Sequence, residues 1–246
     1  GLVFSCYLKL LDGAFDVIHH AILTVCPFVG AVNALIGLIK GEGGIKFPLL
    51  NDNDEFRKIA RTFPAVYELC PLYPEAVVYA KDHPKAGTPF EIYDPDNWQS
   101  NLAPSAMVRR RLEELRHFRI TRPAMQDLSQ LPEDVRARVL ILAGVGEETK
   151  TGVLVEAEGP RGRVQNFFNF DAKEEGAGDG TVPLQSAAFF KDSIQTLKVD
   201  SKWYDKATHA FFLNDGRVQT IIKRFFRDET SSWCWWSDAG GTVDQM

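Results

Sequence analysis

The stretch Arg138-Val139-Leu140-Ile141-Leu142-Ala143, followed by Gly144-Val145-Gly146, decides the fold class of this 246-residue chain. Its apolar residues follow one another without the alternation that a half-buried strand shows, which is typical of a strand buried on both faces of a parallel sheet. The glycines after it predict a turn where the chain leaves the sheet. We therefore take this segment as a central strand and work outward from it.

Two more strands are predicted, one before and one after this segment, at Ile18–Val25 and Ile194–Tyr204. Helical segments separate them, with predicted bounds at Leu2–Leu11, Ala31–Lys40 and Asp215–Phe226. Strands that alternate with helices predict an α/β fold with a mainly parallel sheet. In such sheets the functional loops lie at the carboxyl ends of the strands.

The long segment between the first two predicted strands has a different amino-acid composition. Residues 41–132 are rich in glycine and proline, which predicts a loop-rich insertion with helices at Asp54–Thr62 and Ala106–Phe118. A hairpin is predicted within residues 152–170, around Gly159-Pro160-Arg161-Gly162. The expected organisation is a core of residues 1–40 and 133–228, an insertion of residues 41–132, and a tail of residues 229–246.

Composition excludes several classes of function. The net charge of -5 and the pI of about 5.6 argue against a general nucleic-acid-binding surface. The four cysteines form no C-x-x-C pair, so neither a zinc site nor a thioredoxin-type site is predicted, and the redox compartment stays open. The cluster Trp233-Cys234-Trp235-Trp236 fits either contact with a lipid surface or packing in the core.

One apolar run reaches the length of a membrane span. No Asp, Glu, Lys or Arg lies between Asp16 and Lys40, and about 18–20 apolar residues suffice to cross a bilayer. Pro27 and Gly30 interrupt this run, which favours a buried strand, a turn and a helix. A span over Val17–Ile39 is kept as an alternative.

The most informative candidate for chemistry is Gly176-Ala177-Gly178-Asp179-Gly180-Thr181-Val182-Pro183. Glycines on both sides of Asp179 allow a tight turn that leaves its carboxylate free to face a partner. His209 lies thirty positions later, just past the third predicted strand. A carboxylate and a histidine on successive loops can form the acid–base part of a catalytic triad, in which the acid fixes the imidazole tautomer.

The nucleophile of such a triad is not found in this sequence. No G-x-S-x-G elbow occurs, and Ser5 and Cys6 lie inside the first predicted helix without flanking glycines. The chain opens within an apolar helix, so we expect more of the same domain to precede Gly1.

Several stretches together resemble the lecithin:cholesterol acyltransferase-like branch of the α/β-hydrolases. The resemblance runs in order over residues 1–226, and the stretches that carry it are Gly1-Leu2-Val3, Leu23-Thr24-Val25-Cys26-Pro27-Phe28-Val29-Gly30, Arg61-Thr62-Phe63-Pro64, Leu69-Cys70-Pro71, Gly144-Val145-Gly146-Glu147-Glu148-Thr149, Gly178-Asp179-Gly180-Thr181-Val182-Pro183 and the region of His209. These are similar, respectively, to the end of the G-H-S-M-G-G-L-V elbow, the T-x-G-x-P-F-x-G turn, two parts of the cap, the G-V-G-x-x-T turn, the acid loop and the closing histidine. The turn at Cys26 departs from the pattern, being one residue shorter and lacking its glycine.

The resemblance implies a partial α/β-hydrolase fold in which the insertion of residues 41–132 is the cap and lines an acyl-binding cleft. It implies a lipid acyltransferase or lipase-type ester hydrolase with Asp179 and His209 as catalytic residues and a serine about three residues before Gly1. The oxyanion donors would also lie upstream, so the chain as printed is expected not to turn over substrate and, lacking the earlier strands, to be poorly soluble. The implied partner is a lipid or acyl ester, with peripheral contact to a lipid surface, and neither a metal nor an organic cofactor is implied.

A non-catalytic module that binds a lipid or a protein partner is the alternative from another class. Such a module would keep the cap and lack the nucleophile elbow. It would have no need of Asp179 and His209, so the presence of both residues favours the enzyme. A dinucleotide site is not predicted, because the third glycine of G-x-G-x-x-G would fall on Thr149.

Overall fold

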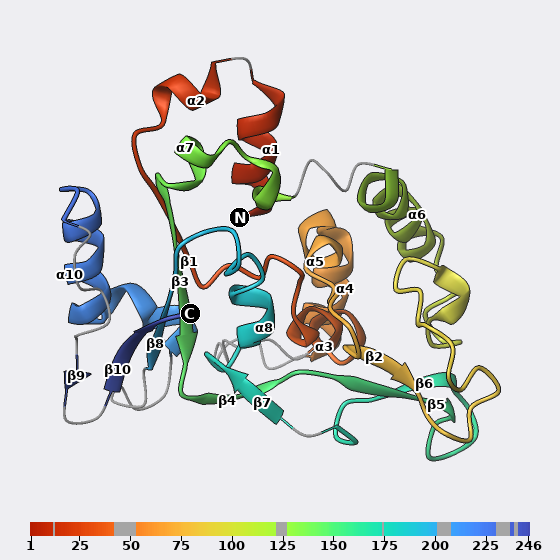
Figure 1. Cartoon of the computed structure of the whole chain (residues 1–246). Helices are drawn as coiled ribbons and strands as arrows, with labels where there is room; N and C mark the ends of the chain where they lie inside the picture. The colour runs from red at the N-terminus through yellow and green to blue at the C-terminus, as the bar shows by residue number, and fades with distance from the viewer. Residues whose placement is uncertain are drawn as a thin grey trace. The chain divides into compact units, whose positions relative to one another are not determined.

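The computed structural model describes residues 1–11, 13–41, 53–121, 127–173, 175–200, 208–229, 237–238 and 241–246. The chain divides into two compact units (Figure 1). The first comprises Gly1–Phe28, Pro123–Thr149 and Gly176–Met246, and the second comprises Val29–Arg122 and Lys150–Glu175. Each unit has its own sheet and its own hydrophobic core.

The first unit is built on a five-stranded sheet with the order β1-β3-β8-β10-β9. Its strands are β1 (Ala21–Thr24), β3 (Val139–Val145), β8 (Thr196–Asp200), β9 (Ser237–Asp238) and β10 (Gly241–Gln245). β1 and β8 both pair with β3 in parallel, in a register that sets Leu23 opposite Ile141 and Leu142 opposite Leu197. β10 is antiparallel to β8 and to β9. The α/β class and the mostly parallel sheet predicted from the sequence are confirmed.

The burial of β3 on both faces explains how this sheet is covered. All seven of its residues are buried, and successive side chains point to opposite faces. Val139 and Ile141 pack in a cluster with Leu8 of α1 (Leu2–Leu10). Leu140 and Leu142 pack in another cluster with apolar residues of α10 (Gly216–Phe225). The remaining helices of this unit are α2 (Ala14–Val17), α7 (Glu133–Arg136), α8 (Leu184–Ala187) and α9 (Thr208–Phe211), with 3₁₀ turns η3 (Leu128–Gln130) and η4 (Phe212–Asn214).

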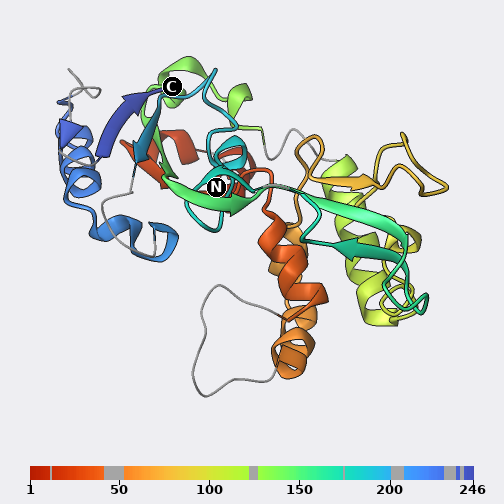
Figure 2. The same ribbon diagram turned by 90° about the horizontal axis from the view of Figure 1, so that it is seen from below.

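The second unit contains a three-stranded sheet with the order β2-β5-β6, and Figure 2 shows it with α6 beside it. β2 (Val77–Tyr79) pairs in parallel with β5 (Val153–Glu158), which forms an antiparallel hairpin with β6 (Gln165–Asn169). Its helices are α3 (Val32–Ile39), α4 (Asn53–Thr62), α5 (Pro64–Glu68) and α6 (Ala106–Thr121), with the 3₁₀ turn η1 (Pro95–Asn97). Large buried aromatic side chains, such as Tyr67, Trp98 and Phe168, fill the core.

The structure differs from the sequence-based expectations at three strands. β2 lies inside the segment expected to be loop-rich, because Val77 and Val78 are β-branched and suit a strand despite the surrounding prolines. β7 (Glu175–Gly178), which pairs with β4 (Glu147–Lys150), overlaps the stretch Gly176–Pro183, whose glycines predict a tight turn. β10 lies in the tail, where the sequence is too polar to predict a strand. The cluster Trp233–Trp236 lies outside the described residues.

The compact units also follow bounds other than those expected. The sequence predicts that α3 and the hairpin of β5 and β6 belong to the core formed by residues 1–40 and 133–228. Both fall in the second unit, since residues from α3, β5 and β6 share one hydrophobic cluster with α5 and α6. The insertion therefore gathers its core from sequence on either side of residues 41–132.

No helix among the described residues is long and apolar enough to cross a bilayer. The described part of the chain likewise contains no group of three or more His, Cys, Asp or Glu side chains placed to hold a metal ion.

The C-terminal strand offers a test of the first unit. Val243 of β10 is fully buried, whereas Val3 of α1 is 81% exposed. We expect Val243→Ala to lower the free energy of unfolding by about 2 kcal/mol, because buried methyl groups are lost and a cavity remains. Val3→Ala, the same change at an exposed position, should have almost no effect. Urea unfolding followed by circular dichroism measures both; equal losses would contradict the placement of β10.

Candidate active site

Asp179 lies at the carboxyl end of the central strand. β3 ends at Val145, and the chain then passes through Gly146 into β4. The φ of Gly146 is +110°, a value that suits glycine. β4 pairs with β7, which ends at Gly178, and Glu147 forms a parallel bridge to Asp179 itself. The acid loop is thus held against the end of β3, where the functional loops of a parallel sheet lie.

Two glycines allow Asp179 to come this close. A methyl group on Gly178 would lie 2.5 Å from both the Thr149 hydroxyl oxygen and the Val182 carbonyl oxygen. A methyl group on Gly144 would lie 2.9 Å from the Asp179 Cβ. Neither distance is compatible with a side chain, so both positions must be glycine for the loop to close.

The Asp179 carboxylate is fully buried and its oxygens have separate partners. Oδ1 accepts hydrogen bonds from the backbone N–H groups of Thr181, at 3.0 Å, and Val182, at 2.7 Å. Oδ2 lies 2.9 Å from the His209 Nδ1. Two backbone N–H groups and the imidazole thus provide hydrogen-bond partners for both oxygens of this buried carboxylate.

Thr149 holds the same loop from the β4 side. Its hydroxyl accepts a hydrogen bond from the Gly180 N–H at 2.9 Å and donates one to the Glu147 carbonyl at 3.1 Å. Gly180 has a φ of +84°, which this sharp turn requires. The Thr149 side chain is buried, so its hydroxyl holds the loop from the protein interior.

His209 lies in α9, after the third parallel strand. Its backbone N–H donates to the Asp179 carbonyl at 3.2 Å, so the two residues are joined through both main chain and side chain. Because Nδ1 faces a carboxylate, Nδ1 carries the proton in the neutral ring and Nε2 is a base. The side chain is 35% exposed, and Nε2 has no hydrogen-bond partner among the described residues.

Comparison with the other histidines shows what is particular to this one. His83 is buried, with Nε2 3.1 Å from the Asn166 Oδ1 and Nδ1 accepting the Lys85 N–H at 3.0 Å, so both nitrogens are satisfied. His20 pairs through Nε2 with the largely exposed Asp228. Only at His209, among these three, does a buried acid fix one nitrogen while the other remains open.

A buried ion pair anchors the segment that carries His209. The Arg217 Nη2 lies 2.6 Å from Asp215 Oδ2 and donates to the carbonyl of Asp200, the last residue of β8, at 2.7 Å. Asp215 also caps α10 by accepting the Arg217 N–H at 2.8 Å. The two ends of the segment between β8 and α10 are thereby tied together. Sequence analysis identified Asp215 only as the start of a helix and missed this anchor.

The structure brings Asp179 and His209 together, but it does not add a nucleophile. No described hydroxyl or thiol hydrogen-bonds the His209 Nε2. Ser5 is fully buried inside α1, where its N–H donates to the Gly1 carbonyl, and Cys6 follows it in the helix. Neither residue lies in a strained turn of the kind that a nucleophile elbow requires.

No protein-family model matches this sequence, and no curated protein matches it significantly. The chemistry of the Asp179–His209 pair must therefore be inferred from its own geometry.

The first prediction for this site concerns the position of a proton. At alkaline pH, where the imidazoles are neutral, we expect His209 to carry its proton on Nδ1 and His20 to carry its proton on Nε2. Asp179→Asn keeps an oxygen for the two backbone N–H groups but presents an amide donor to Nδ1, so the proton of His209 should move to Nε2. Two-bond ¹⁵N–¹H NMR spectra of the imidazoles distinguish these tautomers. An unchanged His209 tautomer in Asp179→Asn would contradict the hydrogen bond.

A second prediction concerns the anchor. Arg217→Ala should lower the free energy of unfolding by about 3–5 kcal/mol, because it leaves the buried Asp215 carboxylate without its partner. The exposed Arg227, which follows the same helix, is the matched control, and Arg227→Ala should stay within about 0.5 kcal/mol of the parent. Denaturant unfolding measures both; equal effects would show that the ion pair does not stabilise the fold.

Proposed function

We propose that Asp179 and His209 are the acid and the base of an acyl-transfer site of the α/β-hydrolase kind, acting on a lipid ester. The observation that carries the proposal is the 2.9 Å hydrogen bond from the His209 Nδ1 to a fully buried carboxylate, with Nε2 left open. The pair lies at the carboxyl end of a mostly parallel sheet, in the order acid then histidine that α/β-hydrolases use. The lipid substrate rests on the sequence resemblance.

In this proposal a serine in the segment that precedes Gly1 supplies the nucleophile. As its Oγ attacks the acyl carbon, the serine proton passes to the His209 Nε2, and the ring becomes an imidazolium. Asp179 holds the ring in the reactive tautomer and stabilises its positive charge. The imidazolium then protonates the leaving alcohol, and an acyl-serine remains.

The second half of the cycle reverses these roles. His209 takes a proton from the acceptor, whose oxygen attacks the acyl-serine, and returns that proton to the serine. Water as acceptor releases a fatty acid, and an alcohol as acceptor forms a new ester. Every proton moves through Nε2, which is the nitrogen that the structure leaves unpartnered among its described residues.

The test uses the protein translated from its native start, with the sequence upstream of Gly1 included. A fluorophosphonate probe should label one serine, and His209→Ala should abolish the labelling. Asp179→Asn should slow it by about four orders of magnitude, because the wrong tautomer then faces the serine. Release of fatty acid from phospholipid vesicles, with and without added alcohol, would distinguish hydrolysis from transfer.

The matched control is His20→Gln, which breaks another histidine–carboxylate pair of the same unit, one whose Asp228 carboxylate is exposed. It should leave the labelling rate unchanged. Labelling that survives His209→Ala, or a folded protein that the probe does not label, would overturn the proposal. The second result would favour a non-catalytic binding role.

A further inference from the structure

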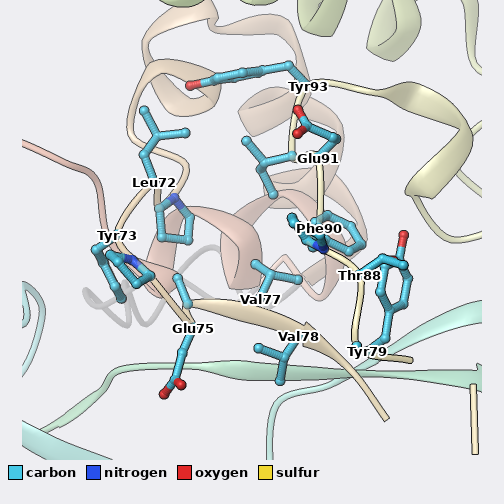
Figure 3. Close-up of a pocket in the computed structure, with 16 residues that line it drawn as sticks. Leu72, Tyr73, Glu75, Val77, Val78, Tyr79, Thr88, Phe90, Glu91 and Tyr93 are labelled. Carbon is cyan, nitrogen blue, oxygen red and sulfur yellow. The ribbon is translucent and has the colours of Figure 1, made fainter. Parts of the chain in front are cut away.

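A pocket of about 680 Å³ lies within the second unit, between the segment Pro71–Tyr79 and the segment Gly87–Tyr93. Figure 3 shows Leu72 and Tyr93 on one side of it, Val77 of β2 on another, and Phe90 and Tyr79 on a third. Its volume is that of a site for a small ligand. Tyr73, Tyr79, Ile92 and Tyr93 are buried, while Leu72 is 39% exposed, so the walls are apolar and the rim is open to solvent.

The pocket reaches the free edge of β2. Val77, Val78 and Tyr79 all line it, although successive side chains of a strand point to opposite faces. A cavity that contacts all three residues must therefore run along the backbone of β2. It must do so at the unpaired edge of this strand, because β5 pairs with the other edge. The bonds from the Val153 N–H to the Ala76 carbonyl and from the Ala80 N–H to the Val155 carbonyl show which groups face β5. The N–H and carbonyl groups of Val77 and Tyr79 therefore both face the open edge.

The charged side chains found at the pocket are acidic. Among the described residues that line it, Glu75 and Glu91 are the charged ones. Figure 3 shows the Glu75 carboxylate directed away from the other labelled side chains, and the Glu75 carbonyl accepts a hydrogen bond from the Lys173 Nζ at 2.8 Å. The Glu91 carboxylate lies beside Tyr93 and has no ion-pair partner among the described residues.

The Tyr79 phenol adds no negative charge to the pocket. Burial, and then the charges of Asp94 and Glu91, raise the pKa of the Tyr79 phenol and keep it neutral. The Tyr79 ring already has the Lys85 Nζ 5.9 Å from its centroid. That ammonium is held 2.6 Å from the Asn97 Oδ1, and Lys85 does not line the pocket. The Tyr79 ring is also stacked on the His83 ring, with their centroids 4.4 Å apart, so the Glu91 carboxylate rather than this ring is the group that attracts a ligand cation.

We propose that this pocket binds a protonated apolar amine, with its ammonium group against Glu91 and its apolar body against Leu72, Val77 and Ile92. The backbone carbonyl groups at the free edge of β2 accept hydrogen bonds from the ammonium. A carboxylate ligand of the same length is disfavoured, because it would meet the Glu91 carboxylate and the described lining residues offer no cation. This site belongs to the second unit and does not depend on the function proposed for Asp179 and His209.

The test compares three probes of equal chain length, n-octylammonium, n-octanol and octanoate, by isothermal titration calorimetry at fixed ionic strength. Octylammonium should bind about tenfold or more tightly than octanoate, with octanol between them. Glu91→Gln should abolish the preference for octylammonium over octanol. Glu113→Gln, which removes an exposed carboxylate of α6 outside the pocket, should leave the order unchanged.

A second variant tests the position of the apolar body. Leu72 is partly exposed, so Leu72→Trp should fold with an unchanged melting temperature while it fills the pocket and weakens all three probes. Octanoate binding as tightly as octylammonium would overturn the proposal. So would an unchanged preference in Glu91→Gln, unchanged binding in Leu72→Trp, or no binding of octylammonium at millimolar concentration.

Discussion

The burial of β3 on both faces is the constraint on which the first unit depends. Because every residue of this strand is buried, its neighbours on both sides must be strands, and the helices must cover both faces. β1 and β8 run parallel to it, so their carboxyl ends meet at one edge of the sheet. The loops that leave that edge bring Asp179 and His209 together, although thirty positions separate them in the sequence.

A buried carboxylate is stable only when its oxygens are satisfied, and the acid loop is built around this requirement. Gly144 and Gly178 remove the side chains that would hold the loop away from β3. The tight turn at Gly180 then aims two backbone N–H groups at one carboxylate oxygen and leaves the other for His209. The same turn thus supports the fold, by burying Asp179 with partners, and orients the imidazole.

Much of this arrangement follows from local sequence signals. The apolar run of β3, the glycines around Asp179 and the amphipathic pattern of α10 each predict the element that is observed. The signals fail where stability comes from distant partners. β10 is polar in sequence and is a strand because it pairs with β8, and Arg217 matters because its guanidinium reaches the carbonyl of Asp200. β2 is hidden among prolines, and it forms because β5 pairs with it.

His83 and His209 differ in how their two ring nitrogens are partnered. A histidine that only stabilises a fold is best served by partners on both nitrogens, as His83 has with Asn166 and the Lys85 N–H. At His209 the chain desolvates a carboxylate to fix one nitrogen, and leaves the other nitrogen without a partner among the described residues. This arrangement suits the proton transfer proposed for Nε2, because a base needs one nitrogen held and the other free.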